Sequence, residues 1–208
     1  MGGVNQIVQA LTMASPTPEA ILADAVTFSP RRWKTGWPHH LRHVPPFRDD
    51  ATATISRGEV FLFAADAVQT EFSRDAVIDF IGAAFAFGAG SKPQVQLKLQ
   101  QFLRNKSNAA ELLRTLRTLP SKDPAQQVAD LEALGLDAQF ASTLAYFLAG
   151  TQEGAEPKPV IVSPSHLAAA GLTGDTSYAE YLAALSVARD EWDATAPLDA
   201  VEFALSRS

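Results

Sequence analysis

One stretch decides the fold: Val77-Ile78-Asp79-Phe80-Ile81-Gly82-Ala83-Ala84-Phe85-Ala86-Phe87, in which nearly every residue is apolar. The large apolar side chains recur at helical spacing, which predicts a buried central helix. The same helix aligns one acid and three small residues at steps of three and four, namely Asp79, Gly82, Ala83 and Ala86. A neighbouring helix is expected to pack against this strip, with Asp79 either at the exposed margin or beside a substrate cleft.

Helix start signals recur on both sides of this stretch. The capping-box spacing, a cap residue followed three positions later by Gln or Glu, occurs as Ser91 with Gln94, Asp123 with Gln126 and Ser177 with Glu180. Thr17-Pro18 and Ser163-Pro164 each give a cap residue followed by proline at the first helical position. About ten helices are predicted, and only Pro159–Val162 is expected to be extended. The predicted fold class is therefore all-α, a compact multi-helix domain with little or no sheet.

The composition is that of an ordinary globular protein. The 208 residues, 47% hydrophobic and 19% charged, are enough for one complete core, so a single domain over residues 1–208 is predicted. The absence of cysteine excludes disulfides, thiol chemistry and cysteine-based zinc sites. Met1–Met13 contains no basic residue, unlike a signal peptide, and no apolar run approaches the roughly 20 residues that a bilayer requires. We therefore expect a cytoplasmic protein without a membrane segment.

Charge is distributed unevenly along the chain. The net charge is −6, but residues 1–122 carry 14 Lys and Arg against 10 Asp and Glu, whereas residues 123–208 carry 3 against 13. The net charge of residues 1–122 is thus +4, and that of residues 123–208 is −10. This asymmetry is compatible with one basic face that binds a polyanion and an opposite, acidic face exposed to solvent.

A long loop from Phe28 to Arg48 interleaves cations with aromatic rings. Its cations are Arg31, Arg32, Lys34, Arg42 and Arg48, and its rings are Trp33, Trp37, His39, His40 and His43. Proteins use such a combination to hold a phosphate backbone and to stack an unpaired base. The alternative is a proline-anchored loop that covers the core, with its Trp residues as packing groups. His39 and His43 stand four apart, but without cysteine no metal site is expected, and no cofactor is predicted.

A second candidate for anion binding is Gly88-Ala89-Gly90-Ser91-Lys92, directly before a predicted helix. Free amides at a helix start, with Lys92 beside them, are suited to a phosphate. A plain glycine-containing turn is the alternative.

The segment Leu131-Glu132-Ala133-Leu134-Gly135-Leu136-Asp137-Ala138-Gln139-Phe140-Ala141-Ser142-Thr143-Leu144 resembles the helix-hairpin-helix of DNA glycosylases, within a hairpin region at 131–150. The resemblance implies that backbone amides around Gly135 hold a DNA phosphate. Pro159-Val160-Ile161-Val162-Ser163-Pro164-Ser165-His166-Leu167-Ala168 is similar to the extended stretch and short helix that close the active site in 8-oxoguanine-type glycosylases. The Gly135 turn and the stretch that ends at Ser163 are therefore expected to form two walls of a nucleobase-sized pocket.

The resemblance also implies which catalytic groups to look for. Members that cleave the DNA strand carry a Lys on the second hairpin helix, where this chain has Gln139, so simple hydrolysis by water is the expected chemistry. The superfamily also places an Asp after the extended stretch, where Ile161 or Ser163 stands here, and residues 157–174 contain no carboxylate. Candidate catalytic residues are Asp79, Gln139 and Ser163, with Asp137 and Asp175 as further acids; Asp137 is equally explained as a helix cap.

The predicted function is that of a DNA glycosylase-like protein. It would act on double-stranded DNA, extrude a damaged or modified base and hydrolyse its N-glycosidic bond, in base-excision repair or in defence against phage. Its candidate DNA-binding residues are Arg31, Arg32, Trp33, Lys34, Trp37, His39, His40, Lys92 and Gly135. One alternative is a catalytically inactive DNA- or protein-binding module on the same scaffold, and another is a helical adaptor that uses its acidic C-terminal half.

Overall fold

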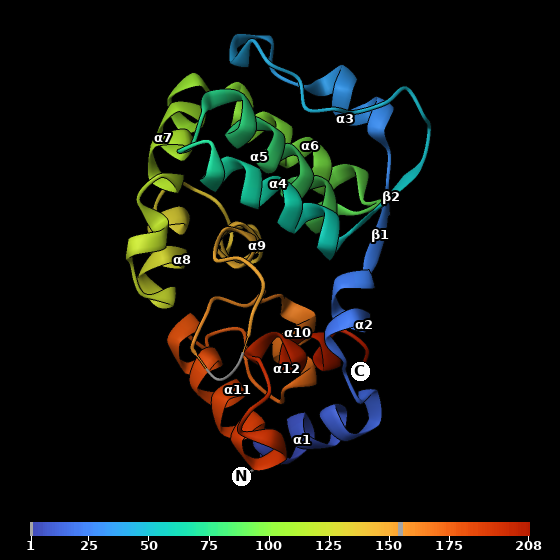
Figure 1. Cartoon of the computed structure of the whole chain (residues 1–208), viewed down its shortest axis with the longest axis vertical. Coiled ribbons are helices and arrows are strands. Elements are labelled where there is room, and N and C mark those ends of the chain that lie inside the picture. Colours follow the sequence, from blue (N-terminus) through green and yellow to red (C-terminus); the bar gives the residue numbers. More distant parts are fainter. Residues whose placement is uncertain (1, 154–155) are drawn as a thin grey trace.

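The computed structural model describes residues 2–153 and 156–208, and within these it is almost entirely helical (Figure 1). The helices are α1 Gly2–Ala14, α2 Pro18–Ala23, α3 Pro30–Gly36, α4 Arg57–Gln69, α5 Arg74–Ala89, α6 Pro93–Arg104, α7 Lys106–Leu116, α8 Pro124–Glu132, α9 Ala138–Leu148, α10 Pro164–Ala169, α11 Tyr178–Asp193 and α12 Leu198–Leu205. Two 3-10 turns, η1 His39–Leu41 and η2 Leu119–Ser121, complete the helical elements. The predicted all-α class is confirmed.

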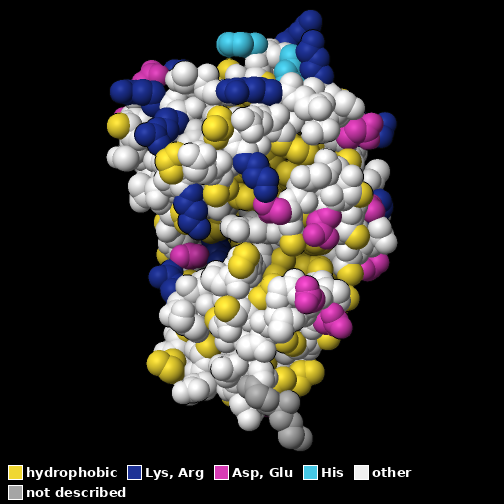
Figure 2. All heavy atoms as spheres, turned by 180° about the vertical axis from the view of Figure 1, so that it is seen from behind, with side chains coloured by type: hydrophobic (Ala, Val, Ile, Leu, Met, Phe, Trp, Pro, Cys, Tyr) yellow, Lys and Arg dark blue, Asp and Glu magenta, His cyan; other side chains and the backbone are white. Residues whose placement is uncertain are grey.

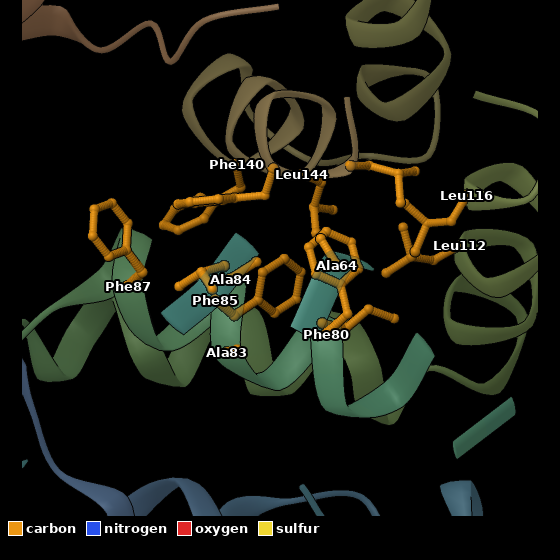
Figure 3. Close-up of a cluster of buried hydrophobic side chains, with 14 of the residues drawn as sticks. Ala64, Phe80, Ala83, Ala84, Phe85, Phe87, Leu112, Leu116, Phe140 and Leu144 are labelled. Atoms are coloured by element: carbon orange, nitrogen blue, oxygen red, sulfur yellow. The ribbon is translucent and has the colours of Figure 1, made fainter. Parts of the chain in front are cut away.

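The predicted central helix is observed as α5, which is buried along most of its length. It packs against α4 and α9, and Figure 3 shows Phe80 and Phe85 of α5 facing Phe140 and Leu144 of α9. The rings of Phe85 and Phe140 meet edge to face with centroids 6.0 Å apart. Such contacts between aromatic rings add to the free energy gained from removing apolar surface from water.

A loop packs against Gly82 of the small-residue strip on α5. A Cβ atom added at Gly82 would lie 2.5 Å from Cγ of Pro45, which shows how closely the loop approaches. At Gly82 the contact predicted for a helix is therefore made by the segment after η1, through Pro45 and Phe47. Glycine is needed at position 82 for this close approach.

Two strands were missed by the sequence analysis. Strand β1 (Ala25–Phe28) pairs antiparallel with β2 (Ala53–Ser56), with Val26 opposite Ile55. The predicted extended stretch Pro159–Val162 is irregular and pairs with neither of them. A four-residue strand shows too few alternations to be recognised in a sequence, so only the contact between the two segments identifies them.

Most predicted helix caps are present. The side chains of Thr17, Asp123, Asp137 and Ser163 each accept a backbone N–H from the first turn of their helix, and Ser177 with Glu180 forms a full capping box. The predicted cap at Ser91 was wrong, because α6 begins at Pro93 and its cap position is Lys92, which makes no side-chain cap bond. No helix among the described residues is long and apolar enough to span a bilayer.

The apolar side chains form two large clusters. The first lies around α5 and includes residues of α3, α4, α6, α7, α8 and α9, and the second joins α1, α10, α11 and α12. The extended segment before α10 contributes to both, because Ile161 belongs to the first cluster whereas Val160 and Val162 belong to the second. Successive side chains of an extended chain point to opposite sides, so this segment separates the two clusters.

Buried polar groups join the two clusters. Arg57, only 2% exposed, binds Glu202 of α12 through both terminal nitrogens, and the Nη2–Oε1 distance is 3.1 Å. The same guanidinium contacts Asp24 and the hydroxyl of Tyr146 on α9. The Tyr146 hydroxyl in turn donates to Oδ2 of Asp199 at 3.0 Å. Burial opposes the charge on Arg57, but Glu202 beside it holds the pKa of Arg57 well above its ordinary value.

We expect Arg57→Met to lower the free energy of unfolding by about 3–5 kcal/mol, because it leaves the buried Glu202 carboxylate without its ionic partner. The double variant Arg57→Met with Glu202→Leu should regain more than half of that loss, since both charges are then removed together. Urea unfolding measures both values. The matched control is Arg114→Met, which breaks an exposed pair with Glu111 and should cost less than about 1 kcal/mol. A single variant Arg57→Met as stable as the control would contradict the structural role of the pair.

Candidate functional site

The predicted hairpin region contains two packed helices, α8 and α9, joined by a short turn. Gly135 in this turn has φ +95° and is exposed, and a Cβ added there would meet nothing within 4 Å. Its amide donates to the Glu132 carbonyl at 2.8 Å, and the Asp137 side chain caps α9 by accepting the amide of Phe140 at 3.1 Å. The turn is thus exposed at Gly135, while the amides of Gly135 and Phe140 are bonded within the chain.

A cavity of about 350 Å³ lies next to the start of α9. Ala138 and Gln139 form one wall of it, and the remaining lining residues are Val162, Ser163, Pro164, Leu167, Ala168, Leu172 and Gly174. Gly135 itself does not line the cavity, but the first turn of α9 that follows it does. The structure thus brings Gln139 and Ser163, two of the three candidate catalytic residues, to one pocket.

The wall that contains Ser163 is extended chain held by side chains rather than by a neighbouring strand. The Val162 amide donates to the hydroxyl of Ser142 at 3.0 Å, and the Tyr178 hydroxyl bonds both the amide and the carbonyl of Val160. The Tyr181 hydroxyl donates to the Ile161 carbonyl at 3.2 Å. These bonds satisfy the buried backbone groups that a sheet would otherwise pair.

Gln139 and Ser163 are themselves fixed by hydrogen bonds. The Gln139 side-chain amide donates to the carbonyl of Gly88 at 3.4 Å, which ties α9 to the end of α5. The Ser163 hydroxyl accepts the amide of His166 at 3.2 Å and lies 2.8 Å from the hydroxyl of Ser165. Both side chains therefore present neutral dipoles to the cavity.

The lining contains no ionisable side chain among the residues that the structure describes. Ile161, at one of the two positions where the resemblance places a catalytic Asp, is buried in the core. Glu202, a buried carboxylate, lies close to α10, with its Oε1 3.5 Å from Nε2 of His166. Sequence reasoning missed Glu202 and Asp199, because nothing in their spacing distinguishes them from exposed acids of an amphipathic helix.

Asp79, the third candidate, does not lie in this pocket. Its carboxylate is hydrogen-bonded to Nε2 of His43 at 2.7 Å and lines a separate cavity of about 400 Å³ beside Phe47. It stands nine residues before Gly88 on α5, roughly 14 Å at 1.5 Å per residue. Burial raises the pKa of Asp79, and the bond to His43 opposes that rise. Asp79 is therefore not placed to act on a substrate held between Gln139 and Ser163.

The loop between Phe28 and Arg48 contains a helix, α3, and its tryptophans are packing groups. Trp33 is 0% and Trp37 3% exposed, and the Trp33 ring stacks on Phe47 with centroids 6.0 Å apart. Neither ring is available to stack a base in this structure, so the expectation that they bind DNA bases is corrected. Composition alone could not reveal this, since buried and exposed tryptophans look alike in a sequence.

The cations of this loop are exposed, and several have local partners. Arg31 donates from Nε to the Asp49 carbonyl at 2.9 Å, and Lys34 pairs with the Asp49 carboxylate at 3.0 Å. His39 is exposed and His40 half-buried. In the described part of the chain, no cluster of three or more ligand side chains suited to a metal ion is found.

Exposed cations occur on α3, directly before α6 and on α6, namely Arg32, Lys92, Lys98 and Arg104. The two helices are joined by Gln100, whose side chain donates to the Arg32 carbonyl at 3.1 Å, and by Arg104, which donates to the Gly36 carbonyl. Lys98 pairs with Asp137 at the start of α9 at 3.1 Å. Figure 2 shows Lys and Arg side chains collected on the upper part of the molecule, the part that holds α3 and α6 in Figure 1. Lys98 and Arg104 are additions to the sequence-based candidates.

The resemblance to DNA glycosylases implied a pocket between the Gly135 turn and the stretch that ends at Ser163, and the structure has a pocket at this stretch whose other wall is the first turn of α9 instead of Gly135. The model of a family described as "Putative 8-oxoguanine DNA glycosylase OGG-like protein" matches residues 19–206, so the chain belongs to this family. Neither a curated protein nor a solved structure gives a significant match.

We expect Gly88→Ala to destabilise the protein by about 1–3 kcal/mol through overpacking. The added Cβ would lie 2.8 Å from Cε1 of Phe140, so α5 and α9 must separate where Gln139 is held. Thermal and urea unfolding test this. Gly174→Ala is the control, because its Cβ would meet nothing within 4 Å, and its effect should stay within about 0.5 kcal/mol. Equal stabilities of the two variants would mean that this contact does not constrain the pocket.

Proposed function

We propose that this protein is a monofunctional DNA glycosylase that hydrolyses the N-glycosidic bond of a damaged or modified base in double-stranded DNA. In this proposal the turn between α8 and α9 holds a DNA phosphate, and the extruded nucleotide enters the cavity between Gln139 and Ser163. The observation that carries it is that these two side chains, from separate elements, line one cavity of about 350 Å³. Family membership supports DNA as the substrate.

The chemistry follows from the groups that line the cavity. A Schiff base requires a primary amine, and the described lining offers only the amide of Gln139 and the hydroxyl of Ser163 as polar side chains. Base release therefore uses water, which these two groups orient, and the strand is left uncut. Without a charged group to stabilise positive charge on the sugar, the substrate must supply a good leaving group, such as a purine made cationic by alkylation.

Two cellular roles agree with such chemistry: base-excision repair of damaged DNA, and removal of enzymatically modified bases from phage DNA. We place the protein in the cytoplasm, where both kinds of DNA are accessible. The leaving-group argument favours repair of alkylation damage as the first role to test.

Incubation with duplexes that carry an N-alkylated purine, 8-oxoguanine, uracil or 5-hydroxymethylcytosine tests the reaction. The expected result is an abasic product that is cut only after alkali, because the protein does not cleave the strand itself. Gln139→Ala should lower the rate at least about tenfold, whereas Gln9→Ala, an exposed glutamine of α1, should leave it unchanged. If no duplex releases a base at high protein concentration, hydrolysis is excluded.

The position of the pocket can be tested without native catalysis. Gln139→Lys introduces a primary amine into the cavity, so borohydride should trap this variant as a covalent adduct with duplex DNA that contains an abasic site. Gel electrophoresis detects the adduct. The wild type and Gln9→Lys give the background from surface lysines, and an adduct yield no higher than this background would show that Gln139 does not face the sugar.

The second candidate function is a DNA-binding module without catalysis, and the uncharged lining of the cavity is the observation that favours it. It predicts salt-sensitive binding of duplex DNA and no base release from any of the duplexes above. Both functions need exposed cations that contact phosphates, and Arg32 and Lys98 are two such cations.

We therefore expect Arg32→Ala and Lys98→Ala each to weaken binding across all sequences and to reduce the salt slope of log K by about 1. Fluorescence anisotropy with a labelled duplex measures this. Arg207→Ala, which removes an exposed arginine paired with Asp24, is the matched control. Unchanged slopes in both test variants would remove Arg32 and Lys98 from the interface.

A further inference from the structure

One buried hydroxyl group contacts both walls of the Gln139–Ser163 pocket. Ser142 lies about one helical turn after Gln139 on α9 and is 0% exposed. Its hydroxyl donates to the Gln139 carbonyl at 3.0 Å and accepts the Val162 amide, also at 3.0 Å. Gln139 belongs to one wall and Val162 lies beside Ser163 in the other, so a single oxygen atom joins the backbones of the two walls.

The bond from Val162 to Ser142 is the polar link between α9 and the second wall. Among the residues that the structure describes, it is the one hydrogen bond between α9 and the extended segment 159–163. The hydroxyls of Tyr178 and Tyr181, which hold the same segment, belong to α11. Ile161 also packs in the first hydrophobic cluster, but apolar contacts are not directional. The separation of the segment from the first turn of α9 therefore depends on Ser142.

We propose that Ser142 is a positioning residue of the pocket, which sets the separation of Gln139 and Ser163 without contacting the substrate. Ser142 does not line the cavity, so it can influence the reaction only through the two walls. This role rests on the proposed glycosylase function. Its effect on the rate is expected to be large, because a displacement of about 1 Å between a bound substrate and the groups that act on it can slow a reaction roughly a hundredfold.

Removal of the hydroxyl would release the second wall. In Ser142→Ala the Val162 amide loses its acceptor, and a buried N–H group without a partner is unfavourable. The segment is then expected to move until this amide reaches water, which can enter from the cavity that Val162 lines. The Gln139 carbonyl keeps a second hydroxyl donor, that of Thr143 at 2.7 Å, so the first wall stays in place.

Thr143 provides the matched control. It is also 0% exposed, and its hydroxyl donates to the same Gln139 carbonyl, but in the described part of the chain it has no hydrogen bond to the second wall. Thr143→Val removes the hydroxyl and keeps the shape of the side chain. An effect of losing any buried hydroxyl near Gln139 would appear in both variants, whereas loss of the bridge occurs only in Ser142→Ala.

Base release is measured with the duplex that the wild type processes fastest, at a temperature well below the melting temperature of each variant. Ser142→Ala should lower kcat at least about tenfold and change KM less than about twofold, because the cations that contact phosphates are unchanged. Thr143→Val should keep both constants within about twofold of the wild type. Ser142→Cys, whose thiol is a weak donor and acceptor, should recover part of the lost kcat, and it replaces Ser142→Ala if that variant does not fold.

The bridge itself is tested without DNA by hydrogen exchange of the Val162 amide, followed by NMR. This amide should be protected in the wild type and in Thr143→Val, and it should exchange at least about tenfold faster in Ser142→Ala. A wild-type Val162 amide that exchanges as in an unfolded chain would overturn the proposal, as would wild-type kcat in folded Ser142→Ala or equal losses of kcat in Ser142→Ala and Thr143→Val. If the wild type releases no base, the reaction is excluded together with any role of Ser142 in it, whatever the exchange rate of Val162.

Discussion

The buried ion pair between Arg57 and Glu202 is the interaction on which the arrangement of the molecule depends. Arg57 begins α4 in the first hydrophobic cluster, and Glu202 lies in α12 in the region of the second. An unpaired charge at either position would be far more costly than the net gain from pairing. The C-terminal helices can therefore dock on α4 only in orientations that close this pair. Tyr146, which is bonded to Arg57, and His166, which lies beside Glu202, extend the constraint to α9 and α10.

This constraint explains how a pocket is formed without a sheet. The pocket has two walls, the first turn of α9 and the segment that ends at Ser163. The contacts of Arg57 with Tyr146 and of Glu202 with His166 fix the positions of α9 and α10, which carry these walls. The extended segment has no strand partner, and hydroxyl groups of Ser142, Tyr178 and Tyr181 take that role. A hydroxyl bonds the backbone of a single residue of this segment without requiring the next residues to pair as in a strand, so the chain can enter α10 directly afterwards. Ser163 then serves both as the helix cap and as part of the cavity wall.

Features that depend on local chemistry could be predicted from the sequence, and features that depend on distant contacts could not. The apolar period of Val77–Phe87 gave the central helix, and the caps at Asp137 and Ser163 follow from neighbouring residues. The predicted helix cap at Ser91 was wrong for a local reason. A residue before proline favours extended backbone geometry, and Lys92, at φ −83° and ψ 102°, therefore takes the cap position before Pro93. The pairing of β1 with β2 depends on contacts between separate segments. The separation of Asp79 from Gln139 depends on which neighbour covers each face of α5.

The position of the acids limits the chemistry that the pocket can support. Glu202 lies behind His166, but its charge is balanced by Arg57, and a carboxylate paired in this way offers little field to a cation on the opposite side of the wall. Asp199 belongs to the same network through the Tyr146 hydroxyl, and it does not line the Gln139–Ser163 pocket. The acids near the pocket thus stabilise the fold, and the groups left to face a substrate are an amide and a hydroxyl. A site of this kind recognises shape and hydrogen bonding well but lowers a barrier to heterolysis only modestly, so the instability of the bond to be broken must come from the substrate.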